Sequence, residues 1–129
     1  MKIEYFADGS LDCPLVLLFG PTTADICALS DVIHDLSQDR INRRAIHELP
    51  GFYGLDGCRL FASCGAADLG LKMIGSPNEF EWSLRPQSWE TVAGLLEPFG
   101  ELEKVSAKSF QYLDERGEIR LLISTDRSW

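Results

Sequence analysis

The residues best suited to binding chemistry lie between positions 40 and 47, where Arg43, Arg44 and His47 follow Arg40. No other stretch of this acidic chain gathers as many basic side chains. An arginine guanidinium can hold a carboxylate or a phosphate through two parallel hydrogen bonds. The cluster is therefore the first candidate for an anion-binding site. The alternative is that these side chains pair with the surplus Asp and Glu residues, as exposed charges commonly do.

Two neighbouring aromatic residues form a second candidate site. Phe52 and Tyr53 are flanked by Pro50-Gly51 and by Gly54, a composition typical of a loop. Aromatic side chains in such a loop either fill the edge of the core or contact a partner protein. We include both residues among the candidate ligand- or partner-binding residues and leave the two interpretations open.

The cysteines and histidines form no recognisable catalytic or metal-binding pattern. The four cysteines include no C-x-x-C pair, which favours a reducing, cytoplasmic setting. Cys58 and Cys64 are predicted to be small apolar residues on one face of a strand, and either could act as a nucleophile only with His47 nearby. His34 can share a helix flank with Cys27, but standard zinc-ligand spacing is absent. We predict no metal site, no cofactor and no catalytic residue.

Common enzyme motifs are also absent from the sequence. It contains no G-x-G-x-x-G, no Walker loop, no G-x-S-x-G and no H-E-x-x-H. Because no catalytic constellation can be assembled, a binding function has more support than an enzymatic one.

Composition and charge restrict the class of protein. The chain has 129 residues, of which 45% are hydrophobic, and this fits one folded domain over positions 1–129. Its net charge is −8, from 20 acidic and 12 basic residues, which opposes binding to nucleic acid and to an anionic membrane. No apolar run is long enough to cross a bilayer, and positions 1–10 do not resemble a secretory signal. The charge does permit a basic protein partner.

The clearest structural unit is a strand followed by a helix between positions 79 and 98. Large apolar residues at positions 80, 82 and 84 alternate with polar ones, which predicts a strand with one buried face. Pro86 ends this strand and begins a helix whose apolar stripe includes Trp89. We therefore expect Trp82 and Trp89 to lie in the core.

A second strand and helix precede this unit. The unbroken apolar run Pro14–Phe19 predicts a central strand that is covered on both faces. Thr22 or Thr23 can cap the next helix, with Asp25 in its first turn and on its exposed face. This helix is expected to end near Gln38.

The rest of the chain is expected to form strands joined by turns and loops, and the loops include Pro50–Gly57 and the polar segment Gly100–Lys108. The expected strands are Lys2–Phe6, Asn42–Leu49, Cys58–Cys64, Leu71–Ile74, Phe110–Leu113 and Ile119–Ser124. The last two form a predicted hairpin in which Gly117 has a positive φ.

The order strand, proline, capped helix, strand, glycine-containing loop, strand occurs twice. Pro21 and Pro86 are 65 residues apart, and Thr23 and Ser88 are separated by the same distance. The pattern fits a duplicated βαββ unit, and it equally fits convergence, because all helix N-termini prefer these residue types. If the unit is duplicated, a cleft between the halves is the expected place for a ligand.

The sequence thus predicts an α+β fold with a mostly antiparallel sheet of six to eight strands and two packed helices. The preferred functional interpretation is a non-enzymatic binding or regulatory protein, an acidic partner of a basic protein, with Phe52 and Tyr53 in the contact. The alternative is a small-molecule-binding protein or small enzyme that holds an anionic ligand at Arg43, Arg44 and His47. A homodimer is compatible with both interpretations.

Overall fold

The computed structural model describes residues 1–75, 77–105 and 109–129 and shows an α+β fold. The strands found in these residues are β1 (Lys2–Phe6), β2 (Leu15–Phe19), β3 (Arg43–Ala45), β4 (Tyr53–Gly54), β5 (Arg59–Cys64), β6 (Gly70–Met73), β7 (Glu79–Leu84), β8 (Phe110–Asp114) and β9 (Arg120–Ser124). The α-helices are α1 (Thr23–Ser37) and α2 (Pro86–Leu96). The predicted fold class and its two helices are confirmed.

The strands form two mixed sheets. One sheet has the order β4-β1-β2-β9-β8, and the other has the order β3-β5-β7-β6. The pairs β1–β2, β8–β9, β3–β5 and β6–β7 are antiparallel, whereas β1–β4 and the inner pairs β2–β9 and β5–β7 are parallel. Antiparallel pairs are therefore in the majority, as expected, but parallel pairing joins the two halves of each sheet.

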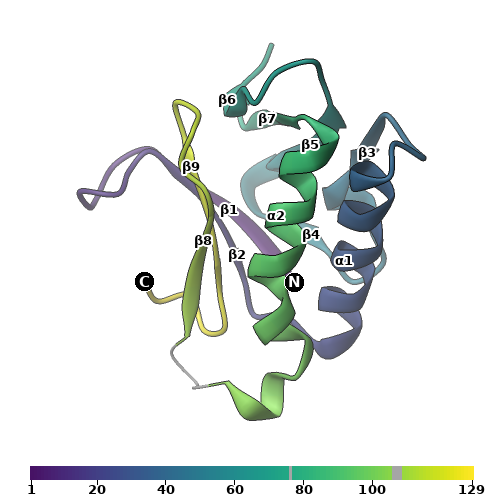
Figure 1. Ribbon diagram of the computed structural model, residues 1–129. Coiled ribbons are helices and arrows are strands. Elements are labelled where there is room, and N and C mark those ends of the chain that lie inside the picture. The colour runs from purple at the N-terminus through teal and green to yellow at the C-terminus, as the bar shows by residue number, and fades with distance from the viewer. Residues whose placement is uncertain (76, 106–108) are drawn as a thin grey trace.

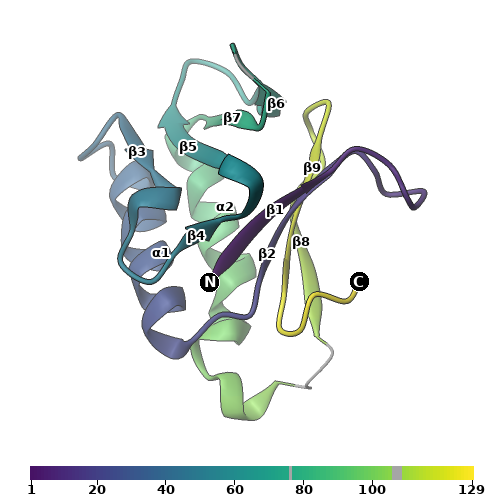
Figure 2. The same ribbon diagram turned by 180° about the vertical axis from the view of Figure 1, so that it is seen from behind.

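The helices α1 and α2 lie side by side and run in opposite directions (Figure 1). In the view from behind, β1, β4 and β5 lie in front of them (Figure 2). The apolar stripes of both helices pack into one core that also contains side chains from both sheets. The helices thus form a layer with one face on the core and the other face toward solvent.

Apart from the short strand β4, which has no counterpart in the second half, the two halves of the chain have the same element order and the same pairing. Each of β1-β2-α1-β3-β5 and β6-β7-α2-β8-β9 consists of an antiparallel pair, a helix and a second antiparallel pair. Each sheet combines the first pair of one half with the second pair of the other, through β2–β9 and β5–β7. The predicted repeat is therefore visible in the topology, as a ββαββ unit, and its halves are interleaved.

Strand β2 lies at the middle of its sheet, and all five of its residues are buried, as predicted. Its residues alternate between the main core and a smaller apolar cluster on the other face of the sheet. The smaller cluster includes Leu17 and is partly covered by Trp129, which packs against Phe6. Both faces of β2 are thus shielded from water by other parts of the chain.

Helix α1 begins at the predicted cap. The Thr22 hydroxyl accepts a hydrogen bond from the Asp25 amide at 3.1 Å, and the Asp25 carboxylate accepts one from the Thr22 amide at 3.0 Å. The C-cap is Gln38, also as predicted. Asp25 is buried rather than exposed, because its carboxylate also accepts a hydrogen bond from the Met1 amino group at 2.7 Å. Burial raises the pKa of the Asp25 carboxyl, but these hydrogen bonds outweigh burial and hold the pKa below its usual value.

Helix α2 follows β7 directly, and both tryptophans of this unit are fully buried, as predicted. The N-terminus of α2 is capped from outside, by Asp68 in the loop between β5 and β6. The Asp68 carboxylate accepts hydrogen bonds from the Arg85 amide at 2.9 Å and from the Ser88 hydroxyl at 2.8 Å. Asp68 thereby satisfies the backbone N–H of Arg85, the residue before the helix, whose own side chain makes no capping hydrogen bond.

Two further local predictions were wrong. The expected strand at positions 42–49 ends at Ala45, and Ile46–Glu48 form a 3₁₀ turn. Ile46 and Leu49 are both buried, and core residues three positions apart fit a helical turn rather than an alternating strand. Gly117 is not among the residues with positive φ. It is needed for close packing, because a Cβ at this position would lie 2.4 Å from the Leu71 carbonyl oxygen.

The polar segment after α2 is only partly irregular. Glu97–Gly100 and Leu102–Lys104 form short 3₁₀ turns, and Phe99 anchors the first of them in the core. The end of the expected loop, residues 106–108, lies outside the described residues.

Candidate functional site

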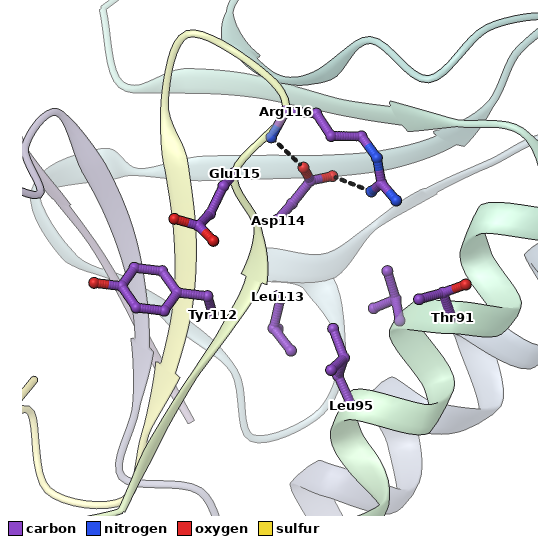
Figure 3. Close-up of a pocket in the computed structure, with 8 residues that line it drawn as sticks. Thr91, Leu95, Tyr112, Leu113, Asp114, Glu115 and Arg116 are labelled. Atoms are coloured by element: carbon purple, nitrogen blue, oxygen red, sulfur yellow. Dashed lines mark hydrogen bonds and ion pairs between the residues drawn. The ribbon is translucent and has the colours of Figure 1, made fainter.

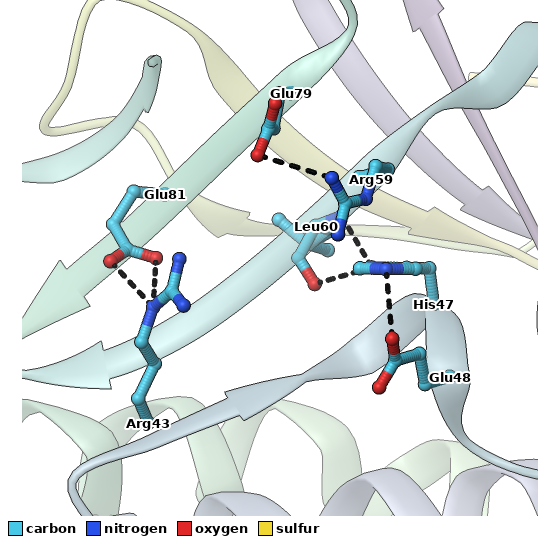
Figure 4. Close-up of polar contacts among 7 residues, drawn as sticks. All are labelled: Arg43, His47, Glu48, Arg59, Leu60, Glu79 and Glu81. Carbon is cyan, nitrogen blue, oxygen red and sulfur yellow. Dashed lines mark hydrogen bonds and ion pairs between the residues drawn. The ribbon is translucent and has the colours of Figure 1, made fainter. Parts of the chain in front are cut away.

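The basic cluster lies on and beside β3, at one edge of the β3-β5-β7-β6 sheet (Figure 4). The Arg43 Nε donates to both carboxylate oxygens of Glu81, at 3.0 and 3.3 Å. The guanidinium carbon of Arg43 lies 3.8 Å from the centre of the Phe61 ring, a cation–π contact. Arg43 is therefore held by an acid on β7 and by an aromatic ring on β5.

His47 contacts the same aromatic ring from the 3₁₀ turn after β3. Its Nδ1 accepts a hydrogen bond from the Leu60 amide at 3.0 Å, and its ring meets Phe61 edge-on with the centroids 5.1 Å apart. Its Nε2 lies 3.9 Å from a carboxylate oxygen of Glu48. Only 12% of the side chain is exposed, so His47 has little surface to offer a ligand.

Arg44 does not converge with Arg43. Consecutive strand residues point to opposite faces of a sheet, and the register places Arg43 opposite Ser63 and Arg44 opposite Ala62. Arg44 is exposed, and the described part of the chain provides no ion pair to its side chain. The structure thus brings Arg43 and His47 together around Phe61 and leaves Arg44 apart.

Phe52 and Tyr53 have different surroundings. Phe52 is 7% exposed and belongs to the main core. Tyr53 is 71% exposed and lies on β4, an edge strand. Of the two aromatic side chains, Tyr53 is the one that a partner can reach.

The two cysteines at β5 are not placed to act as nucleophiles. Burial raises the pKa of Cys58 to about 12, and the negative charge of Glu4 adds to the effect. Burial also raises the pKa of Cys64, with a contribution from Asp39, and its Sγ donates to the Leu36 carbonyl at 3.1 Å. The thiolate is the reactive form of cysteine, so the raised pKa values disfavour both side chains as nucleophiles.

A groove runs between helix α2 and strand β8 (Figure 3). Its volume is about 390 Å³, and its lining consists of Thr91, Val92, Leu95, Tyr112, Leu113, Asp114, Glu115 and Arg116. Leu95 and Leu113 face one another from the two walls, whereas the side chains of Tyr112 and Glu115 point away from α2. The wall on the β8 side is therefore partly made of backbone.

Asp114 is fixed at one end of this groove. Its side chain is 0% exposed and lies 3.5 Å from the Arg116 guanidinium. One carboxylate oxygen accepts a hydrogen bond from the Trp82 indole at 2.8 Å, and the other accepts one from the Arg116 amide at 2.8 Å. These contacts hold the turn after β8 in place beside the groove.

The helical side of the molecule carries exposed negative charge that nearby cations do not neutralise. Among the described residues of this region, Arg40 pairs with Asp35 and Lys104 pairs with Glu101. Five other exposed carboxylates have no ion pair with the described residues: Asp31, Asp39, Glu90, Glu97 and Glu103. We refer to these five residues as the acidic helical layer.

Neither the groove nor the acidic helical layer was predicted from the sequence. The groove forms only where α2 meets β8, and the pairing of β8 with β9 at the sheet edge is not visible in local patterns. The charge of α2 was a usable signal for the acidic helical layer. This helix contains Glu90 and no basic residue, and Glu97 follows it directly.

Within the described residues, no group of three or more His, Cys, Asp or Glu side chains is arranged to hold a metal ion. The same part of the chain contains no helix that is both long and apolar enough to cross a membrane. Comparison of the chain with protein-family models, with curated proteins and with solved structures found no match in any of the three.

Proposed function

We propose that this chain is a non-enzymatic binding or regulatory protein that holds a basic protein partner. The observation that carries this proposal is the acidic helical layer, whose five exposed carboxylates lack a cation among the described residues. Complementary charge on a partner would supply those cations. The net charge of −8 supports the same choice of partner.

The expected mode of association follows from the exposure of these carboxylates. Charged groups at the rim of an interface mainly accelerate encounter and exclude partners of the same charge. Their effect extends over about 8 Å at physiological ionic strength and weakens as salt is added. Binding to the basic partner is therefore salt-sensitive.

A small-molecule site or small enzyme at Arg43, Arg44 and His47 remains the alternative, with less support. Arg43 already has Glu81 and Phe61 as partners, and His47 is largely buried. Arg44 is free of ion pairs within the described residues, but it lies on the other face of β3. An anion would have to displace existing contacts to reach all three side chains.

A reducing, cytoplasmic setting is part of the proposal. All four cysteines are free, and exposed Cys27 in particular would be open to oxidation elsewhere. A homodimer is also compatible with the proposal, provided that the acidic helical layer stays outside the dimer contact.

The test is native mass spectrometry of the chain purified from its own host without overexpression. The expected result is a complex with a protein rich in Lys and Arg that dissociates when the ionic strength is raised. A chain that carries a small anion and no protein would contradict the proposal and favour the alternative at Arg43, Arg44 and His47.

Charge reversal then locates the contact. The double variant Asp31→Lys, Glu97→Lys changes two residues of the acidic helical layer and should weaken the complex at least about tenfold. The matched control is Asp8→Lys, Glu118→Lys, which makes the same change in net charge at exposed positions outside the helices. Equal weakening by both variants would mean that net charge, and not this surface, is responsible.

A further inference from the structure

The outer face of strand β2 is an apolar surface that neither helix covers. It consists of Leu15, Leu17 and Phe19, and Leu122 of the neighbouring strand β9 completes one buried cluster with them. Among the described residues, no side chain of α1 or α2 packs against this cluster, because both helices lie on the other side of the sheet (Figure 1). None of the four residues is more than 8% exposed. Other segments of the chain therefore cover this face.

Residues 126–129 supply part of this cover. They follow β9 and reach β1, and in the sheet order β1-β2-β9 this path crosses the outer face of β2. The Arg127 guanidinium donates to the Glu4 carboxylate of β1 from Nε and from Nη2, both at 3.1 Å. The Trp129 ring packs on the ring of Phe6, also on β1, with the ring centres 5.3 Å apart. We refer to residues 126–129 as the strap.

Two side chains of the strap contact the apolar face itself. The guanidinium carbon of Arg127 lies 5.8 Å from the centre of the Phe19 ring. Trp129 packs against the cluster that includes Leu17 and Leu122. These two side chains thus shield residues that would otherwise form an exposed apolar patch at the middle of the sheet.

The contacts that hold the strap are near the surface. The strap lies outside every strand of the described chain, so no strand pairing fixes it. The Arg127 side chain is 54% exposed, and Ser128 and Trp129 are only half-buried. The Ser124 hydroxyl donates to the Ser128 carbonyl at 2.6 Å, which ties the strap to the end of β9 rather than to β1. Segments with few buried contacts open locally at a lower free energy than the core does.

Arg127 also carries backbone strain. Its φ is +80°, in the left-handed region where residues other than glycine are uncommon and persist only when their surroundings hold them. The ion pair with Glu4 and the packing of Trp129 on Phe6 hold this segment. Opening the strap relieves the strain, so the closed and open states differ less in free energy than these contacts alone would indicate.

We propose that the strap opens as a unit while both sheets and both helices stay folded, and that it is a reversible cover for the apolar face of β2 and β9. The ion pair between Arg127 and Glu4 holds the strap closed, and Trp129 shields the apolar cluster. The strap lies on the face of the sheet away from α1 and α2 (Figure 2). This conformational change is therefore separate from the acidic helical layer and goes beyond the proposed function.

Quenching of tryptophan fluorescence by acrylamide, in the whole chain, measures the opening. Trp82 and Trp89 are fully buried, so quenching at low acrylamide concentration reports on Trp129. Glu4→Gln removes the charge that holds Arg127 and should raise the quenching constant at least about twofold.

Two further variants complete the test. The matched control is Glu81→Gln, which removes the ion pair of Arg43 on the other sheet and should leave the quenching constant within about 1.2-fold. Trp129→Ala uncovers the apolar face. It should raise the fluorescence of the dye anilinonaphthalene sulfonate, which binds exposed apolar surface, at least about threefold, with the helical circular dichroism unchanged.

Four results would overturn the proposal. Unchanged quenching in Glu4→Gln, or an equal rise in Glu81→Gln, would mean that the ion pair of Arg127 does not hold the strap closed. No gain in dye fluorescence in Trp129→Ala would mean that the face stays covered without the strap. A gain that comes with loss of the helical circular dichroism would mean that Trp129 belongs to the cooperative core and that the strap does not open alone.

Discussion

The indole nitrogen of Trp82 donates a hydrogen bond to a carboxylate oxygen of Asp114 inside the core, over 2.8 Å. This bond joins β7 in one sheet to the end of β8 in the other. A buried carboxylate is costly unless hydrogen bonds and opposite charge replace its hydration, and Trp82 and Arg116 supply both here. The contact also fixes the end of the groove between α2 and β8.

We predict that Trp82→Phe destabilises the fold more than Trp89→Phe does. Both changes remove the same atoms from the core, but the Trp82 indole donates to a carboxylate and the Trp89 indole donates to the Ser63 carbonyl, at 3.0 Å. Hydrogen bonds to charged groups contribute about 1.5–3 kcal/mol, against about 0.5–1.5 kcal/mol for neutral pairs. Urea denaturation at neutral pH measures the difference. Equal losses would mean that Asp114 finds a replacement partner.

Asp68 provides a second prediction, because it caps α2 from another loop. Asp68→Asn keeps an acceptor oxygen but removes the charge, and at neutral pH it should lower the free energy of unfolding by about 1 kcal/mol. The expected cause is the loss of charge-assisted hydrogen bonds from Arg85, whose side-chain nitrogen lies 3.0 Å from the carboxylate. Thermal and urea unfolding of the two proteins gives the difference.

The effect of Asp68→Asn on the free energy of unfolding should also depend on pH. The side-chain hydrogen bond from Arg85 is the largest of the effects that hold the pKa of Asp68 well below its usual value. A carboxyl with a depressed pKa in the folded state stabilises the fold above its unfolded pKa of about 3.9, and this stability is lost as the pH falls toward the folded pKa. The advantage of the unmodified chain over Asp68→Asn should therefore be constant from pH 7 to 5 and shrink below about pH 4. A constant difference down to pH 3 would exclude the charge as its source.

Local patterns in the sequence were sufficient to predict several strands and helices. β2 was predicted from an apolar run, the start of α1 from a capping hydroxyl at Thr22 or Thr23, and the β7–α2 unit from alternation followed by Pro86. In each case the physical cause acts within a few residues: side-chain spacing, a capping hydroxyl, or the missing N–H of proline.

Other features depend on contacts between distant residues, and local patterns could not predict them. Asp25 is at an expected first-turn position, but it is buried because the Met1 amino group reaches it. The parallel pairing of β2 with β9 joins segments about a hundred positions apart, and it places β8 at the edge next to α2. The candidate groove is a consequence of that pairing, which is why residue spacing alone did not reveal it.

Replacing Gly94 by alanine is expected to increase the stability of the fold. It lies inside α2, it is exposed, and a Cβ at this position would have no neighbouring atom within 4 Å. Gly94→Ala should therefore raise the free energy of unfolding by about 0.5–1 kcal/mol through helix propensity. The contrasting control is Gly70→Ala, because Gly70 has φ +75° and a Cβ there would lie 2.3 Å from the Gly117 backbone nitrogen. This control should be clearly destabilised in the same thermal unfolding assay.

The last prediction separates the roles of Arg43 and Arg44. Arg43→Ala removes the contact with Phe61 and the ion pair with Glu81, and it should lower the free energy of unfolding by about 0.5–1.5 kcal/mol. Arg44→Ala removes no ion pair with the described residues, so a change within about 0.5 kcal/mol is expected. Arg43→Lys keeps the charge but not the planar guanidinium, and it should fall between the two. If both alanine variants are as stable as the unmodified chain but lose a bound anion, the cluster is a ligand site, and the arginines are not mainly structural.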